Sequence, residues 1–238
     1  MKVDLVNEGD PWDVLNREIV TCVRCPRLVA WREKVACTKR RAYRDWEYWG
    51  RPAPGFGDHR ARFLIVGLAP GAHGANRTGR MFTGDSSGKT LYGALYRAGL
   101  ASQPTSERRD DGLVLYDTFI TAAARCAPPE NRPDVQELAN CRLFLERELA
   151  LLPNVRVVLA LGKIAFDEYC RLLQEQGHAV PRLAFGHGVR YDFAPPLPTL
   201  MASYHPSQQN TQTGRLTMEM FDAVFRQVRE ELRLTSVA

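Results

Sequence analysis

The apolar positions of the chain follow two patterns, which predict strands and helices in alternation. Continuous apolar runs such as RFLIVGLA at 62–69 and VRVVLAL at 155–161 predict buried strands, and similar runs predict strands at 113–123 and 197–203. Apolar residues that recur every three or four positions predict the following helices: 12–33, 90–100, 134–152, 163–175 and 218–232. Pro26 interrupts the first of these helices, because proline does not fit a helix interior.

Alternating strands and helices predict an α/β fold, with a mainly parallel sheet covered by helices on both faces. We interpret residues 1–238 as a single domain, in which residues 1–61 form an Arg-rich N-terminal lobe. Ligands of such sheets bind beyond the carboxyl ends of the strands. Three loops follow predicted strand ends and are the candidate site: 67–88, 124–132 and 203–215.

Composition narrows the class of protein. The 238 residues are 45% hydrophobic, which suits a globular chain, and no apolar run approaches the roughly 18 residues of a membrane span. The acidic N-terminus lacks the apolar segment of a signal peptide, so we expect a cytoplasmic protein with no membrane partner.

The net charge of +5 comes mainly from arginine, since only five of the 32 basic residues are lysine. Residues 17–62 hold twelve basic and five acidic residues, interleaved with the aromatic residues Trp31, Tyr43, Trp46, Tyr48 and Trp49. Such a stretch can follow a nucleic-acid backbone, but it is also typical of a solvated surface, and a GC-rich genome is the main explanation of the arginine excess. Charge alone does not decide between these readings.

The six cysteines include two spaced pairs. Cys22 and Cys25 form C-x2-C, and Cys126 and Cys141 form C-x14-C, so the four thiolates can complete one metal site. Ligand type does not separate zinc from a [4Fe-4S] cluster, and buried thiols are the alternative. Cys170 lies in an apolar helix and is predicted to be a core residue, whereas Cys37 remains an alternative ligand.

Two of the candidate loops carry side chains suited to catalysis. In the glycine-rich segment 67–85, Phe82 offers a stacking face, and Asp85 is the one carboxylate, either catalytic or a helix cap. His205 directly follows a predicted strand, and the polar run after it suits contacts with phosphates and sugars. GDSSGKT at 84–90 is one residue short of a phosphate-binding loop, so a nucleotide hydrolase is a minor alternative.

Several of these segments resemble family 5 (type B) uracil-DNA glycosylases, iron–sulfur members of the uracil-DNA glycosylase superfamily. The similar segments are CVRCPRLVAWRE (22–33), PGFGD (54–58), GLAPGAHGANRTGRMFTGD (67–85), RCAPPENRP (125–133) and SYHPSQQNTQTGRLT (203–217). The resemblance spans roughly residues 15–230. It implies a three-layer α/β/α sandwich around a four-stranded, mainly parallel sheet. It also implies a structural [4Fe-4S] cluster held by Cys22, Cys25, Cys126 and Cys141.

The resemblance further implies a monofunctional hydrolase for DNA repair, which flips a deaminated base out of double- or single-stranded DNA and leaves an abasic site. We assign catalysis to Asp85, His205 and Asn131, with Asp85 as the first candidate to orient the water. The substrate-binding residues that we predict are Gly67, Leu68, Ala69, Phe82, His73 and Asn76. The DNA-binding residues that we predict are Ser207, Gln208, Gln209, Asn210, Thr213 and Arg215. The competing class is a non-catalytic iron–sulfur module that binds DNA.

Two positions depart from the related family 4 pattern. Leu68 replaces the glutamate of its GEAPG motif, and Ala122 replaces an asparagine that reads the uracil edge. Loss of that asparagine relaxes the choice of base, so the prediction includes hypoxanthine beside uracil. We expect the protein to act as a monomer.

Overall fold

The computed structural model describes residues 9–234. A six-stranded sheet of order β1-β3-β2-β4-β6-β5 forms its centre. Its four inner strands are parallel, and the short edge strands pair antiparallel. The strands are β1 (Phe56–Gly57), β2 (Phe63–Gly67), β3 (Thr118–Ala122), β4 (Val157–Leu161), β5 (Arg190–Tyr191) and β6 (Thr199–Ser203). The four predicted parallel strands are therefore confirmed. The two edge strands, each of two residues, were not predicted, because no apolar run marks them in the sequence.

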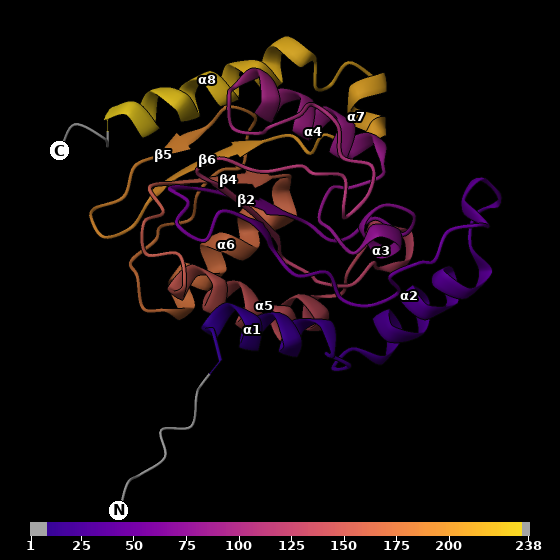
Figure 1. Cartoon of the computed structure of the whole chain (residues 1–238). Coiled ribbons are helices and arrows are strands. Elements are labelled where there is room, and N and C mark those ends of the chain that lie inside the picture. The colour runs from indigo at the N-terminus through magenta and orange to yellow at the C-terminus, as the bar shows by residue number, and fades with distance from the viewer. Residues whose placement is uncertain (1–8, 235–238) are drawn as a thin grey trace, which may run out of the picture.

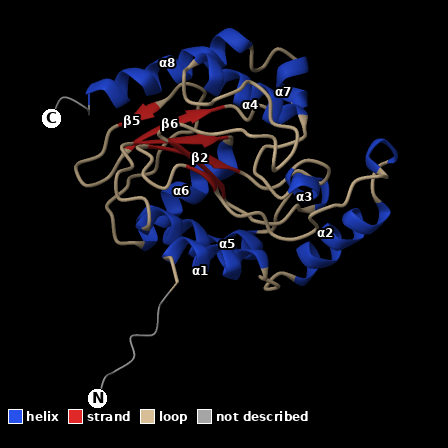
Figure 2. Cartoon of the chain, in the orientation of Figure 1, coloured by secondary structure: helices blue, strands red, loops and turns tan. Residues whose placement is uncertain are grey.

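Helices cover both faces of the sheet (Figures 1 and 2). The longer ones are α1 (Pro11–Val20), α2 (Pro26–Thr38), α4 (Ser86–Arg97), α5 (Val135–Ala150), α6 (Lys163–Glu175) and α8 (Met218–Leu234). The short ones are α3 (Ala75–Thr78), α7 (Gln208–Gln212), and the 3-10 turns η1 (Arg41–Tyr43) and η2 (Pro129–Asn131). In Figure 1, α4 and α8 lie over one face, and α1, α5 and α6 lie over the other.

Alternation along each strand separates the core into two halves. Phe63 and Ile65 of β2 pack into the cluster with α4 and α8, whereas Leu64 and Val66 pack into the cluster with α5 and α6. A parallel strand buried on both faces reads as a continuous apolar run, which explains why these strands were recognisable in the sequence. The predicted three-layer α/β/α sandwich is confirmed.

The predicted helix 12–33 is two helices. Pro26 is the first residue of α2, a position where its missing N–H has no helical partner to lose. The helix predicted to start at residue 90 starts at Ser86, because the Asp85 carboxylate caps its first turn. The strand predicted over 113–123 is confined to Thr118–Ala122, with only an isolated bridge from Leu115 to Ala101 before it.

No helix in the described part of the chain combines the length and apolar character needed to cross a lipid bilayer.

Candidate active site

The carboxyl ends of the parallel strands lie side by side, as the sequence predicted. Gly67 at the end of β2 pairs with Ala122 at the end of β3, and Leu161 of β4 pairs with Ser203 of β6. The pairing continues past β3, because the amides of Ala123 and Ala124 donate to the carbonyls of Gly67 and Leu68, both at 2.9 Å. The loops 67–88, 124–132 and 203–215 therefore leave the same edge of the sheet.

Phe82 and His205 come together at this edge. Their ring centroids are 5.9 Å apart, and their planes differ by 28°. The edge of the Phe82 ring lies in the space that a side chain at Gly67 would occupy, since a Cβ there would be 2.8 Å from the ring. Phe82 has a left-handed backbone, with φ of 52°. The structure thus holds an aromatic face against the end of β2, with an imidazole opposite.

His205 is partly buried, and burial lowers the pKa of its imidazole to about 4. The ring is consequently neutral at physiological pH and can donate one N–H to an acceptor without carrying a charge. Its backbone is fixed by Asn210, whose side-chain amide donates to the His205 carbonyl at 2.9 Å. Such a neutral donor beside an aromatic face suits a ligand that develops negative charge on an oxygen.

Asp85 follows Phe82 by three residues, and its two carboxylate oxygens have different surroundings. Its Oδ1 accepts the amide of Gly88 at 2.9 Å and so caps α4, which is one of the two roles expected for it. Its Oδ2 faces the preceding turn, since a Cβ at Gly74 would be 2.0 Å from that oxygen. Burial raises the pKa of the Asp85 carboxyl, which the amides of Gly88 and Ser87 and the charge of Arg77 counteract.

This capping also rules out a phosphate-binding loop at GDSSGKT. The first turn of α4 is occupied by the Asp85 carboxylate, whereas a phosphate loop presents free amides to its ligand. The strand β2 also ends at Gly67, far before this helix begins. The structure therefore gives no support to the nucleotide-hydrolase alternative.

Two buried arginines that the sequence did not single out fix the loop around Asp85. Arg77 donates from Nε to the His73 carbonyl and from Nη2 to the Gly84 carbonyl, both at 2.8 Å. Arg80 pairs with Asp111 at 2.7 Å. Both lie in the segment 67–85, but nothing in their local pattern indicated burial. Their partners lie on separate loops, and only the fold brings them together.

His73 and Asn76 are held by the N-terminal lobe. The Nδ1 atom of His73 lies 3.0 Å from the Tyr48 hydroxyl. Asn76 is fully buried, and its amide donates to the Arg32 carbonyl of α2 at 3.2 Å. These side chains link the glycine-rich segment to α2, and in the described residues no hydrogen bond or ring contact joins them to Phe82 or His205.

Asn131 is exposed at the end of η2, with a left-handed backbone of φ 56°. Among the described residues, no hydrogen bond joins its side chain to Asp85 or His205. The structure thus brings Phe82 and His205 into contact, with Asp85 on the same loop as Phe82, whereas Asn131 lies on an exposed turn of loop 124–132.

The segment predicted to contact DNA forms a short helix instead of an open loop. Ser207 caps α7 by accepting the Asn210 amide at 3.3 Å, and Thr213 donates to the Gln209 carbonyl at 2.8 Å. Gln208 and Gln209 expose their side chains. The exposed Arg215 guanidinium lies over the Tyr204 ring, 4.6 Å from its centroid. Asn210 and Thr213 therefore hold the segment, whereas the glutamines and Arg215 face outward.

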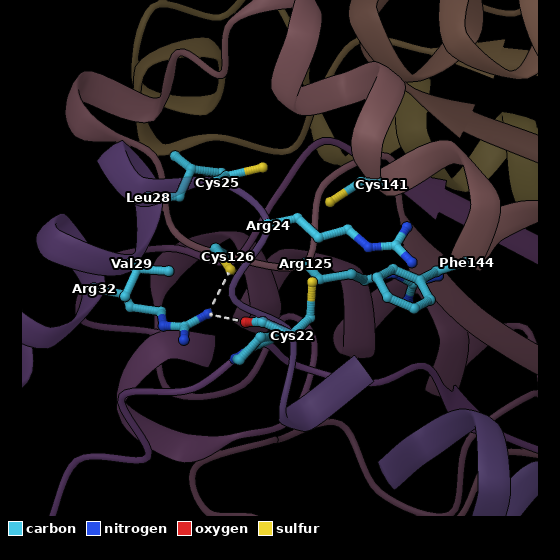
Figure 3. A pocket seen from close by; sticks show the side chains of 11 residues that line it. Cys22, Arg24, Cys25, Leu28, Val29, Arg32, Arg125, Cys126, Cys141 and Phe144 are labelled. Atoms are coloured by element: carbon cyan, nitrogen blue, oxygen red, sulfur yellow. Dashed lines mark hydrogen bonds between the residues drawn. The ribbon is translucent and has the colours of Figure 1, made fainter. Parts of the chain in front are cut away.

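The four cysteines of the two spaced pairs line one cavity between α2 and α5 (Figure 3). Cys22 and Cys25 come from the segment between α1 and α2, Cys126 from the loop after β3, and Cys141 from α5. Burial raises the pKa of the Cys126 thiol, and it raises that of Cys141 to about 12. Cys37 is exposed, and Cys170 is a partly buried residue of α6 that packs against the core, so neither lines this cavity.

Two buried arginines face the same cavity with incomplete hydrogen bonding. Arg32 donates to the Cys126 sulfur at 3.0 Å, but its Nε has no partner. Arg125 pairs with Glu148 at 2.5 Å, and its Nε and Nη1 have no partner. Among the described residues, no three His, Cys, Asp or Glu side chains meet closely enough to hold a single metal ion.

Comparison with known proteins places this arrangement in a family. Residues 54–232 match the uracil DNA glycosylase superfamily. A type-5 uracil-DNA glycosylase of Thermus thermophilus is 56% identical, over 85% of this chain and 90% of the relative. The chain is a member of this family.

Further relatives support that membership. A type-5 uracil-DNA glycosylase of Mycobacterium bovis is 51% identical over 91% of this chain and 80% of the relative, and one of Pyrobaculum aerophilum is 47% identical over 90% of both. A type-4 uracil-DNA glycosylase of Pyrobaculum aerophilum is only 32% identical, over 68% of this chain and 74% of the relative. The type-5 relatives are thus clearly more similar than that type-4 enzyme, which confirms the resemblance to family 5.

Proposed function

We propose that this protein removes uracil from DNA by hydrolysing the N-glycosidic bond, and that it leaves an abasic site. The observation that carries the proposal is the stacking of Phe82 on His205 at the carboxyl edge of a type-5 family fold, with Asp85 three residues after Phe82 on the same loop. A base inside a duplex is out of reach of such an edge, so the target nucleotide must leave the stack. Phe82 then stacks on the flipped base beside the backbone of Gly67, Leu68 and Ala69.

The proposed reaction breaks the bond between the sugar C1′ and the base nitrogen, with the electron pair going to the base. His205, a neutral donor, stabilises the resulting oxyanion of uracil by a hydrogen bond. The sugar carries oxocarbenium character in this step. Asp85 orients a water toward C1′ and accepts its proton, so the first products are the uracil anion and the hydroxylated sugar; the anion then takes up a proton, and Asp85 releases its own to solvent.

In this proposal, exposed residues at the border of the site contact the DNA. Gln208, Gln209 and Arg215 contact the strand that the base has left, while Ser207, Asn210 and Thr213 hold α7 in place. Asn131 is the second candidate to position water, or to contact the sugar–phosphate backbone, from its exposed turn.

Uracil release is tested with a duplex that contains one uracil. We expect the free base in solution and a strand that breaks only after alkali, because a monofunctional hydrolase leaves the backbone intact. A protein that binds this duplex but releases no base would be the non-catalytic module instead.

We further propose that the pocket accepts hypoxanthine as well as uracil. Ala122, which pairs with Gly67, is buried and carries no group that could read the uracil edge. An enzyme that lacks such a polar reader discriminates weakly between bases. We expect hypoxanthine release from duplex DNA, and we expect A122N to lower it relative to uracil release by about tenfold or more. Absence of hypoxanthine release beside clear uracil release would contradict this prediction.

We also propose that Cys22, Cys25, Cys126 and Cys141 hold a [4Fe-4S] cluster. Zn–S bonds of about 2.3 Å would draw four thiolates to within about 3.8 Å of one another, whereas a cluster keeps its ligands farther apart. Thiols that surround a cavity without meeting at one point suit the cluster. The unpaired N–H groups of Arg32 and Arg125 suit an anionic group at this place.

In this proposal the cluster has a structural role, because it crosslinks segments that are far apart in the sequence. Cys141 packs with Ala123 and Ala124, against which Ala69 also packs. These residues continue β3 beside β2, so the crosslink braces the floor of the proposed pocket.

A further inference from the structure

Arginine and aromatic side chains stack on one another beside the Gly84–Asp85 turn. The Arg77 guanidinium lies between Tyr43 and Trp46, at 3.9 and 4.0 Å from their ring centroids. The Arg108 guanidinium lies 4.4 Å from the centroid of the same Trp46 ring. Two loops far apart in the sequence, 40–49 and 106–111, therefore meet on the segment that carries Asp85.

A second contact of the same kind joins these loops. The guanidinium of Arg109 lies 4.6 Å from the centroid of Trp49, and the Trp49 amide donates to the Arg77 carbonyl at 2.9 Å. The other loop is anchored by the ion pair of the buried Arg80 with the partly buried Asp111. Both loops are thus fixed by buried partners, and the stacked guanidinium groups are held in place at their surface.

Five arginines of these loops present positive charge to solvent. All five are exposed. In the described part of the chain, no carboxylate lies within 4 Å of their guanidinium nitrogens. Other surface arginines do have such a partner; Arg97, for example, pairs with Asp222. They are Arg40, Arg41, Arg44, Arg108 and Arg109. Arg40, Arg41 and Arg44 line a shallow hollow together with Ala42 and Asp45.

We propose that these five arginines form a second phosphate-binding surface, which holds the DNA backbone beside the pocket. The proposal rests on the proposed function, since it concerns the same substrate. In Figure 1 the segment after α2 projects from the end of the molecule where α3 and α7 also lie. The pocket would therefore have one DNA contact at 207–215 and another on these arginines.

The arrangement of the cations favours a polymer backbone over a small anion. The arginines are spread over two loops instead of converging on one point, as repeated phosphates require. A guanidinium stacked on an indole keeps its N–H edge free and loses less freedom when it binds. The surface also joins directly to the site, because Arg77 of the stack holds the Gly84 carbonyl before Asp85.

The test measures how DNA affinity depends on salt. The probe is a fluorescent duplex of about 20 base pairs with a tetrahydrofuran abasic analogue, which the enzyme cannot process, titrated over a series of KCl concentrations. The variants R41Q/R44Q and R108Q/R109Q each remove two charges from the surface. The variant R226Q/R233Q removes two exposed arginines from α8, outside both DNA contacts, and serves as the matched control.

Each phosphate contact contributes about 0.9 to the slope of log affinity against log salt, so each of the two surface variants should lower its magnitude by about 1.8. The control should keep the slope of the unmodified protein. If all three variants keep that slope while the unmodified protein releases uracil, the surface proposal is wrong and the proposed function stands. If the unmodified protein releases no uracil, the proposed function fails, whatever the slopes.

Discussion

Replacing Asp85 with asparagine is expected to lower the rate of uracil release by about 10²–10⁴-fold, the range typical of a lost general base. Asparagine keeps the Oδ1 acceptor that caps Gly88, and it is as good a helix cap as aspartate. The variant therefore removes the charge and the proton acceptor without removing the cap. The measurement is single-turnover release of uracil from a duplex, beside the melting temperature of both proteins.

The pH profile separates a catalytic carboxylate from a structural one. Burial raises the pKa of Asp85, so its ionised fraction falls at a higher pH than that of an ordinary aspartate. The activity of the unmodified protein should decline on the acid side as this group protonates, and the residual activity of D85N should lack that decline. His205 does not produce the same limb near neutrality, because its pKa is already about 4.

A second substitution, at Gly74, tests the same carboxylate by displacing it. An alanine Cβ at Gly74 would lie 2.0 Å from the Asp85 Oδ2, so G74A must displace it. The matched control is G93A in α4, where the nearest atom is the flexible end of Arg97 at 3.3 Å. We expect G74A to lose most activity and G93A to keep it. Full activity of both D85N and G74A would move the role to Asn131.

The sequence predicted those features that depend on short stretches of chain. Buried parallel strands are apolar on both faces, so β2 and β4 could be recognised without any knowledge of their neighbours. His205 comes just after β6, and Phe82 and Asp85 lie in the loop that leaves β2; the carboxyl edge of a parallel sheet brings such loops together. The edge strands β1 and β5 are two residues long, which is too short for any periodicity.

The features that the sequence missed depend on partners far along the chain. The burial of Arg80 is stabilised by Asp111, and Arg77 is held between Tyr43 and Trp46, so no local pattern distinguishes either from an exposed arginine. Asn76 was expected at the substrate, but its amide is bonded to the carbonyl of Arg32 in α2. The interleaving of arginine and aromatic residues after position 40 was the one available signal of the stack.

If the proposed [4Fe-4S] cluster is present, replacing Cys126 with serine should remove it and destabilise the whole fold. The four thiols of the cavity connect the N-terminal lobe, the loop after β3 and α5. Loss of a metal site belongs to the substitutions that cost more than about 4 kcal/mol of unfolding free energy. For a domain of this size, that corresponds to a fall of about 10 °C or more in melting temperature.

The control is C37S, because Cys37 is exposed on α2 and does not line the cavity. We expect the unmodified protein and C37S to be brown and to contain about four iron atoms per chain, as a [4Fe-4S] cluster requires. C126S should lose the colour and most of the iron. Iron and absorbance are measured on purified protein, so the result does not depend on activity. Stoichiometric zinc in the unmodified protein, or a C126S variant as stable as C37S, would refute the proposed cluster. In that case the unpaired N–H groups of Arg32 and Arg125 would need a different anionic partner in this cavity.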